Sequence, residues 1–118
     1  MRYQETEILD HQTGLIWMRQ VKAELIFSEA QDYARKVAKQ TGQAWRLPTL
    51  GELQTFPFCE SCESESQTFW SSDPVKGLPE YRNCLCTVSG VSWVHYGLAY
   101  YRLYAVRLVR TAYQVTPR

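Results

Sequence analysis

The chain has 118 residues, with 13 basic and 12 acidic side chains, a net charge of +1 and a hydrophobic content of 45%. A chain of this size can bury one core, so a single domain over residues 1–118 is predicted. Phosphate binding needs concentrated positive charge, so the balanced charge disfavours nucleic acid as the main partner. The N-terminus lacks the apolar core of a signal peptide, and no stretch is long enough to span a bilayer. We expect no membrane partner and a cytoplasmic location, or export if a leader has been removed.

A β-hairpin and a helix are predicted first along the chain. The hairpin covers residues 7–18, and its turn ends at Gly14, which tolerates a positive φ. The helix is expected to begin at Ser28, with Gln31 as its capping partner. Apolar residues recur at helical spacing until Gly42, where a left-handed residue can end the helix. One face of this helix is therefore expected to pack inward.

A sharp corner is predicted at residues 45–49, Trp-Arg-Leu-Pro-Thr. Pro48 disfavours helix for the residue before it, so the chain arrives there extended. Thr49 and Glu52 have the spacing of a reciprocal cap, in which each side chain bonds the backbone N–H of the other. A short second helix is expected over residues 50–56.

The remainder divides into an irregular segment and a β-meander. Residues 58–80 are dominated by Ser, Glu, Pro and Gly, which predicts a long loop that must be held in place. From Tyr81 the pattern alternates, and strands are expected at residues 83–88, 91–96 and 100–109. Tight turns are expected at residues 89–90 and 97–98.

Five motifs in this order resemble a known family. They are Thr13-Gly14-Leu15-Ile16-Trp17, Phe27-Ser28-Glu29-Ala30, Trp45-Arg46-Leu47-Pro48-Thr49 with Glu52-Leu53, Phe69-Trp70-Ser71-Ser72, and Val106-Arg107-Leu108-Val109-Arg110. Together, over residues 8–110, they resemble the Lcl C-terminal domain, a bacterial domain of unknown function at the C-terminus of collagen-like adhesins. Motifs that match in order and spacing are far more specific than any single one.

The resemblance implies an α+β fold of the C-type-lectin-like kind. Two helices, a small and mainly antiparallel sheet joining the termini, and a long irregular loop region are the expected parts. Relatives with this fold bind carbohydrate or protein or, in the formylglycine-generating enzymes, oxidise a cysteine, so fold alone does not decide function. The family's motifs bring no catalytic residues to this chain.

The large residues of these motifs have a structural interpretation. We expect Trp17, Trp45, Leu47 and Trp70 to lie in the core, because large aromatic side chains at such positions fill interiors. We expect Arg46, Arg107 and Arg110 to hold loop carbonyls or a carboxylate such as that of Glu52, and ligand binding is the weaker interpretation.

Four cysteines give the clearest chemical lead. Cys59 and Cys62 are separated by the two-residue gap of metal sites, and Cys84 and Cys86 place two sulfurs on one face if their segment is extended. A tetrahedral structural zinc site formed by these four sulfurs would tether the long loop to the meander. Disulfides would tether the same segments in an exported protein, and free thiols are normal inside a cell.

A cysteine-dependent oxidase is a further alternative, because the formylglycine-generating enzymes use a cysteine pair. Their pair lies near the C-terminus with a longer gap, whereas the last cysteine of this chain is Cys86. The oxidase interpretation therefore ranks below binding and below a zinc-tethered structural or self-assembly domain.

An aromatic group near the C-terminus is the candidate binding surface. Its members are Trp93, His95, Tyr96, Tyr100, Tyr101 and Tyr104. Because side chains alternate along a strand, one face is expected to join the core and the other to present tyrosine to a partner. We predict a non-enzymatic module that binds a protein or a glycan through the long loop and the meander. Homodimerisation would use the same surface.

Overall fold

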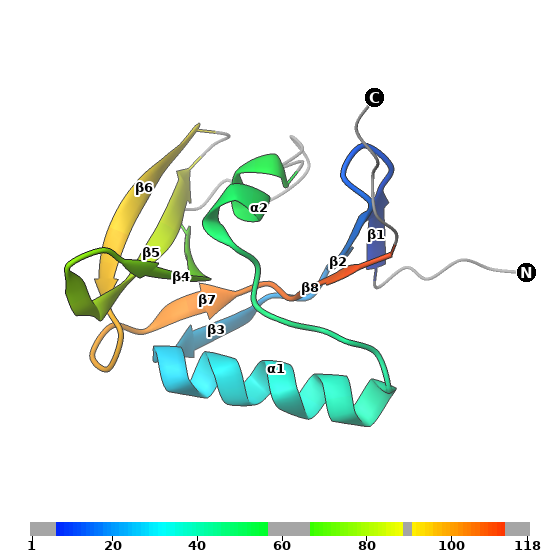
Figure 1. Ribbon diagram of the computed structural model, residues 1–118, viewed down its shortest axis with the longest axis horizontal. Coiled ribbons are helices and arrows are strands. Elements are labelled where there is room, and N and C mark those ends of the chain that lie inside the picture. Colours follow the sequence, from blue (N-terminus) through cyan, green and yellow to red (C-terminus); the bar gives the residue numbers. More distant parts are fainter. Residues whose placement is uncertain (1–6, 57–66, 89–90, 113–118) are drawn as a thin grey trace, which may run out of the picture.

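The protein is α+β, with two helices and two sheets in the residues that the computed structural model describes, 7–56, 67–88 and 91–112 (Figure 1). The elements in chain order are β1 (Glu7–Asp10), β2 (Leu15–Met18), β3 (Lys22–Leu25), α1 (Phe27–Thr41), α2 (Leu50–Thr55), β4 (Gln67–Val75), β5 (Leu78–Val88), β6 (Val91–Leu98), β7 (Tyr104–Val106) and β8 (Val109–Thr111). The predicted α+β class is confirmed. In these same ranges no helix is long and apolar enough to cross a membrane.

The first and last described strands share a small antiparallel sheet of order β1-β2-β8. The predicted hairpin is confirmed, with β1 paired to β2 and Gly14 at a φ of 76° where the turn ends. On the other side of β2, Leu15 lies opposite Thr111 and Trp17 lies opposite Val109. The expected sheet that joins the two ends of the chain is therefore present.

A second sheet has five strands in the order β3-β7-β4-β5-β6. β7 runs antiparallel to β3 and parallel to β4, so it lies at the inside of the sheet and away from β6. The predicted meander is therefore wrong in its last strand: the chain turns at residues 99–101 and divides residues 100–109 into a loop, β7 and the start of β8. The turn lies beyond the expected residues 97–98, which belong to β6, and residues 89–90 lie outside the described part.

The long loop predicted for residues 58–80 is also wrong where the chain is described. Residues 67–80 form β4 and the start of β5, which pair antiparallel from Gln67 opposite Thr87 to Val75 opposite Leu78. Two register shifts, on either side of Pro74, interrupt this ladder. The proline and glycine that suggested a loop lie instead at the irregular end of the β4–β5 hairpin. Residues 57–66 lie outside the described part.

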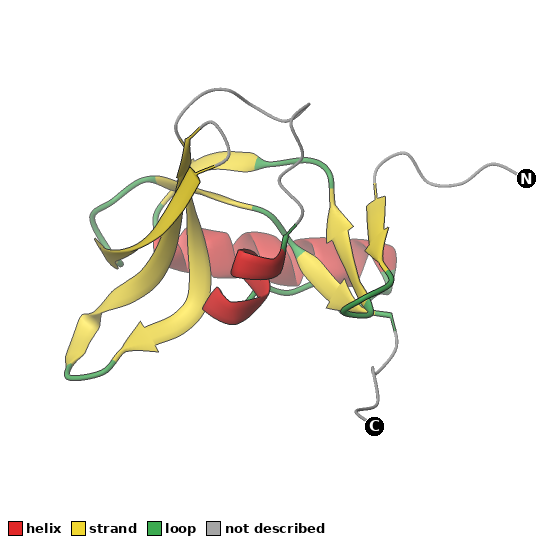
Figure 2. Cartoon of the chain, turned by 90° about the horizontal axis from the view of Figure 1, so that it is seen from above, coloured by secondary structure: helices red, strands yellow, loops and turns green. Residues whose placement is uncertain are grey.

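Each face of the five-stranded sheet has its own apolar cluster. On one face α1 packs with Phe27 and Ala30 against Trp70, Cys84 and Val106. On the other face α2 and the small sheet pack against the alternate residues of the same strands. Figure 1 shows the two helices on opposite sides of β7, and Figure 2 shows the longer helix running along the length of the molecule. The predicted core residues Trp17, Trp45, Leu47 and Trp70 are all buried.

The start of α1 differs from the prediction. The helix begins at Phe27, and the carboxylate of Glu29 accepts a hydrogen bond from the N–H of Ile26 at 3.0 Å. Ser28 is exposed in the first turn, so the expected cap of Ser28 with Gln31 is wrong. The earlier start lets Phe27 point inward, where its ring meets Trp70 edge-on at 5.5 Å. The predicted end of the helix at Gly42, with a φ of 72°, is confirmed.

A buried arginine joins the two sheets. Arg107 lies in the link between β7 and β8, and its Nη1 donates to the carbonyl oxygen of Arg19 at 2.9 Å and to that of Met18 at 3.3 Å. Its guanidinium lies over the rings of Phe56 and Phe69, 4.4 and 5.6 Å from the centroids. The expectation that this arginine holds loop carbonyls is confirmed. It fixes the point at which the chain passes from one sheet to the other.

Candidate functional site

β6 is an edge strand whose only paired neighbour, among the strands described, is β5. The pairing is antiparallel and continuous from Val91 opposite Val88 to Leu98 opposite Tyr81. All residues from 91 to 96 are exposed, although residues 84–87 of the neighbouring strand are buried on both faces. The sheet therefore ends in a strand that offers both of its faces and a row of backbone groups to a partner.

The two faces of β6 carry different candidate residues. Trp93 lies opposite Cys86 and His95 lies opposite Cys84, so these two side chains share the face toward α1. Tyr96 belongs to the opposite face, because neighbours in a strand alternate. The expectation that one face is core therefore holds only at the end of β6, where Gly97 is buried.

The turn after β6 adds further exposed side chains. The N–H groups of Tyr101 and Arg102 donate to the carbonyl oxygen of Leu98, which closes the turn directly against the strand. Seven apolar and aromatic side chains of β6 and this loop are 41 to 70% exposed. We call them the aromatic surface: Val91, Trp93, Val94, Tyr96, Tyr100, Tyr101 and Leu103.

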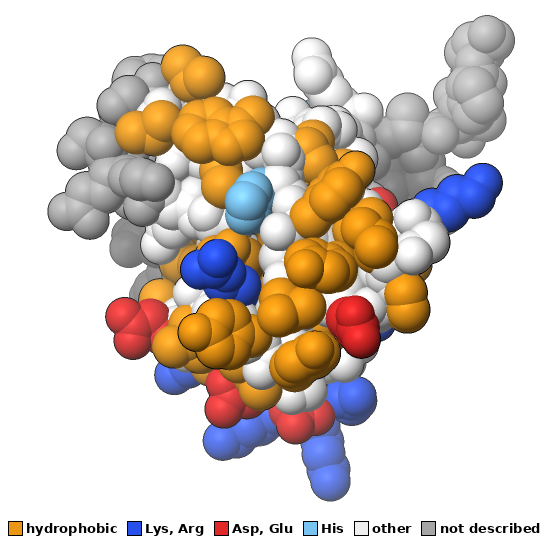
Figure 3. Space-filling view, turned by 90° about the vertical axis from the view of Figure 1, so that its left-hand side faces the viewer, with side chains coloured by type: hydrophobic (Ala, Val, Ile, Leu, Met, Phe, Trp, Pro, Cys, Tyr) orange, Lys and Arg blue, Asp and Glu red, His pale blue; other side chains and the backbone are white. Residues whose placement is uncertain are grey.

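Figure 3 looks at the side of the molecule on which β6 lies. Hydrophobic side chains, drawn orange, spread over its upper and central parts, and most of the charged side chains lie toward the lower margin. Exposed apolar side chains that lie singly need no explanation, whereas a gathered group marks an interaction site.

Tyr104 stands apart from the other predicted residues. It lies in β7, half-buried, with its ring 5.0 Å from that of Trp70 and 6.3 Å from that of His95. Burial raises the pKa of its phenol, and the nearby thiol of Cys84 adds to the effect. The structure therefore brings Trp93, His95, Tyr96, Tyr100 and Tyr101 to the exposed edge and places Tyr104 beneath them as support.

The cysteines of β5 lie in the core. Cys84 and Cys86 are buried free thiols on the face that packs toward α1. Burial raises the pKa of Cys84 to about 12, and the neighbouring thiol of Cys86 contributes. Cys86 lies 3.0 Å from the hydroxyl of Thr68. The environment of Cys84 therefore favours the neutral thiol, whereas zinc ligation requires a thiolate.

The predicted zinc site extends beyond these two residues. Cys59 and Cys62 lie outside the described residues, so the site formed by all four sulfurs stays a prediction. In the ranges that the structure does describe, no three His, Cys, Asp or Glu side chains are grouped as metal ligands.

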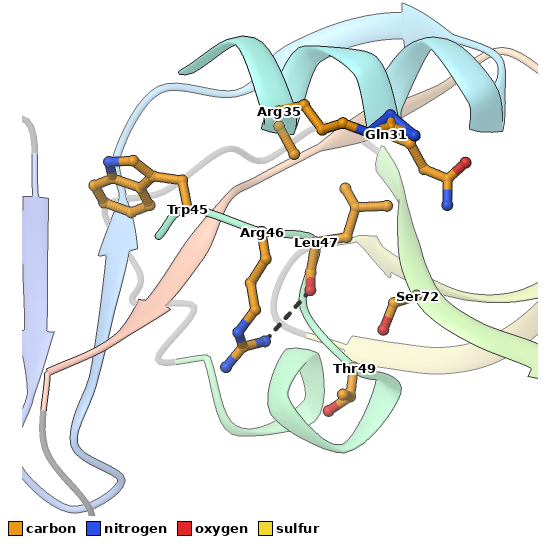
Figure 4. A pocket seen from close by; sticks show the side chains of 8 residues that line it. Gln31, Arg35, Trp45, Arg46, Leu47, Thr49 and Ser72 are labelled. Carbon is orange, nitrogen blue, oxygen red and sulfur yellow. Dashed lines mark hydrogen bonds between the residues drawn. The ribbon is translucent and has the colours of Figure 1, made fainter. Parts of the chain in front are cut away.

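A groove of about 440 Å³ lies between α1 and residues 45–49 (Figure 4). Gln31 and Arg35 border it from α1, and Leu47 lies between them and Ser72. The side chain of Arg46 points away from α1 and binds Glu52, and Arg35 pairs with Asp32 at 2.9 Å. Both arginines that border the groove thus have carboxylate partners.

Sequence reasoning missed the aliphatic part of the aromatic surface. Val91, Val94 and Leu103 were not expected there, because only aromatic residues were singled out. A signal was present, since residues 91–98 form a strand-length run that contains no Lys, Arg, Asp, Glu or Pro. Whether such a run lies at an edge depends on strand order, which the sequence pattern does not reveal.

Comparison with known proteins adds one positive finding. The family model described as the Lcl C-terminal domain matches residues 6–110, from before β1 into β8. No curated protein and no solved structure matches the chain.

Proposed function

The chain belongs to the Lcl C-terminal domain family, and on this premise we propose that it is a non-enzymatic module that binds a protein through its aromatic surface. The C-type-lectin-like fold is part of the proposal. Its support is the sheet that joins the first and last described strands, with two helices between them in the chain. In such a fold the scaffold is rigid and the recognition surface lies on added strands and loops.

The observation that carries the proposal is the exposure of seven apolar and aromatic side chains on one edge strand and its adjoining turn. Trp93 is 48% exposed and Tyr101 is 70% exposed, in a protein whose other tryptophans are buried. Exposed aromatic side chains give large contact area at low entropic cost and are enriched at the centres of interfaces.

A protein ligand is favoured over a glycan because the loop after β6 exposes an aliphatic side chain as well as aromatic ones. Leu103 is 56% exposed, in the same loop as Tyr100 and Tyr101. Apolar and aromatic side chains together are typical of protein interfaces, whereas a glycan would use only the aromatic rings and scattered polar groups. The experiment below therefore includes a glycan array, so that binding of a sugar would be detected.

Binding is favoured over redox catalysis by the state of the described cysteines. An oxidase needs an accessible thiolate as its nucleophile. Cys84 is fully buried, and its raised pKa keeps the thiol neutral at physiological pH. The two remaining cysteines lie outside the described residues.

The test compares ligand selection by four proteins. The wild type, a double variant Tyr100→Ser with Tyr101→Ser, and the single variants Leu9→Ser and Leu78→Ser are each exposed to a displayed peptide library and to a glycan array. Leu9 and Leu78 are 42 and 43% exposed and lie outside the aromatic surface, so they control for the loss of an exposed apolar side chain.

The wild type and both control variants are expected to enrich the same peptides, and the double variant is expected to lose them. Selective glycan binding that depends on the two tyrosines would show that the ligand is a sugar and would refute the protein ligand. Equal enrichment by all four proteins, or none by any of them, would overturn the aromatic surface as a binding site.

A further inference from the structure

We propose that the free edge of β6 pairs with β6 of a second copy of this chain, antiparallel and about a two-fold axis. This inference rests on the proposed function, because it assigns the strand part of the aromatic surface to self-association. The turn with Tyr100 and Tyr101 remains free for the ligand. The two five-stranded sheets then become one continuous sheet.

The two edges of the sheet differ in their protection. β3 has four residues that include Lys22 and Glu24, its pairing with β7 shifts register, and Glu24 has a φ of 63°. A short, charged and irregular strand is the usual means by which a sheet edge avoids pairing with another molecule. β6 has eight residues, an unbroken register with β5 and no Lys, Arg, Asp, Glu or Pro. The fold thus protects one edge and leaves the other available.

The charge of β6 favours a second copy as the occupant. Two copies of a strand without Lys, Arg, Asp or Glu meet with no like-charge repulsion, whereas an acidic or basic peptide finds no opposite charge along residues 91–98. Valine, tryptophan and tyrosine are also the residues that pair well across strands. A strand with these properties is complementary to itself.

Strand geometry restricts the register. The two-fold axis between two antiparallel strands is perpendicular to the sheet, so the same face of the sheet points the same way in both copies. Residues that lie directly opposite each other must therefore belong to the same face of β6. The longest overlap of residues 91–98 then centres on Val94 or on His95. Val94 lies opposite Val94 of the second copy in the first register and diagonally from it in the second. In both registers a long side chain at position 94 reaches its own counterpart.

The area available indicates a weak dimer. Val91, Trp93, Val94 and Tyr96 expose between 41 and 61% of their surfaces. With ~150–250 Å² for a large side chain, this gives roughly 400 Å² per copy, about half of the ~800 Å² per partner of a standard stable interface. The backbone bonds between the two strands add to it. We therefore expect a dimer that forms with rising concentration and dissociates on dilution.

The experiment uses opposite charges at position 94. The wild type, Val94→Lys, Val94→Glu, an equimolar mixture of these two variants, and Leu9→Lys are studied by sedimentation velocity over a range of concentrations. Val94 and Leu9 are 41 and 42% exposed, so the control matches both the exposure and the charge of the substitution. Each single variant at position 94 is expected to raise the dimer dissociation constant at least ~10-fold. The mixture is expected to recover a mixed dimer, and Leu9→Lys to behave as the wild type.

A second measurement on the wild type does not depend on the variants. Amide hydrogen exchange of residues 91–98 is expected to slow at alternate positions in concentrated solution and to return on dilution. A wild type that stays monomeric at ~200 µM would overturn the inference. A dimer unaffected by charge at position 94, or variants whose mixture does not associate, would overturn it equally. If a variant at position 94 does not fold, the exchange pattern of the wild type decides.

The two proposals fail separately. A monomer that still selects ligands through Tyr100 and Tyr101 refutes the pairing of β6 and leaves the proposed function intact. A dimer whose ligand selection ignores those tyrosines supports the pairing and refutes the binding site. If both hold, each dimer presents two ligand-binding turns, and avidity for a repetitive partner follows.

Discussion

Arg46 binds Glu52 with both of its terminal nitrogens, Nη1 to Oε1 at 2.8 Å and Nη2 to Oε2 at 2.9 Å. The same carboxylate accepts the N–H of Thr49 at 2.9 Å, and the Thr49 hydroxyl accepts the N–H of Glu52 at 3.0 Å. The backbone of Arg46 in turn pairs with that of Val109 in both directions. The predicted cap and the expected role of Arg46 are confirmed. One carboxylate therefore joins the start of α2 to the small sheet at the far end of the chain.

Replacing this carboxylate should destabilise the protein. We expect Glu52→Gln to lower the free energy of unfolding by about 1–2 kcal/mol, since an amide loses the charge of the bidentate pair and part of the cap. Arg46 is partly exposed, so solvent screening keeps the effect modest. Urea denaturation measures it, with Gln54→Ala on the exposed side of α2 as control. A cost no greater than that of the control would contradict the assigned role.

The same carboxylate should contribute to acid sensitivity. Burial opposes the ionisation of Glu52, but the hydrogen bonds from Arg46 and Thr49 outweigh it, and the net effect lowers the pKa in the folded state. A lowered folded pKa gives stability that is complete above the unfolded value of 4.5 and is lost as pH falls through the folded value. Unfolding midpoints at a series of pH values below 4.5 should therefore fall more steeply in the wild type than in Glu52→Gln. Parallel pH profiles would refute the coupling.

Local signals in the sequence predicted the parts of the fold that depend on neighbouring residues. The hairpin with Gly14, the end of α1 at Gly42 and the corner at residues 45–49 each have their cause within a few residues of the chain. The start of α1 did not follow its local signal. There the burial of Phe27 against Trp70 outweighs the capping preference of Ser28, and tertiary packing decides where the helix begins.

Long-range contacts explain the larger errors. β4 contains Ser71, Asp73 and Pro74, which favour a loop, but the Ser71 hydroxyl is buried and donates to the carbonyl oxygen of Asn83 at 2.6 Å. The indole N–H of Trp70 donates to the carbonyl oxygen of Leu25 at 2.8 Å. Polar residues in this strand have partners that are distant in sequence, so composition alone gives the wrong element.

The candidate site shows the same division between local pattern and topology. Aromatic composition was enough to indicate Trp93, Tyr96, Tyr100 and Tyr101, which the structure places on the exposed edge. It could not separate Tyr104 from them, because the inward position of this residue follows from the place of β7 between β3 and β4. The alternation of side chains along one strand does not reveal the order of the strands in the sheet.

A glycine of β6 should not tolerate a methyl group. A Cβ at position 97 would lie 2.6 Å from a ring carbon of Tyr104, 2.9 Å from the sulfur of Cys84 and 3.1 Å from Trp70. We expect Gly97→Ala to cost about 1–3 kcal/mol of unfolding free energy by overpacking. Gly51→Ala is the matched control, because Gly51 is exposed on α2 and its nearest contact is 3.9 Å away, and it should stabilise by about 0.5–1 kcal/mol. Equal effects in denaturant titrations would show that the packing around position 97 is looser than described.

The buried thiol of Cys84 should make the protein sensitive to alkali. Burial, with the neighbouring Cys86, raises its pKa from 9.0 to about 12, so the proton is held more tightly in the folded state. A raised folded pKa gives stability that is complete below pH 9 and is lost as pH rises toward 12. By pH 10.5 the loss should be on the order of 1–2 kcal/mol, measured by urea denaturation between pH 7.5 and 10.5.

In Cys84→Ala the protein starts less stable because of the cavity, but its stability should change less over this range. Tyr33 also has a raised pKa and titrates alike in both proteins. The pKa of Tyr104 is raised in part by Cys84, so the difference between the two profiles reports the thiol together with its effect on that phenol. Rapid alkylation of Cys84 in the folded protein, located by mass spectrometry, would contradict the buried and neutral state assigned to it.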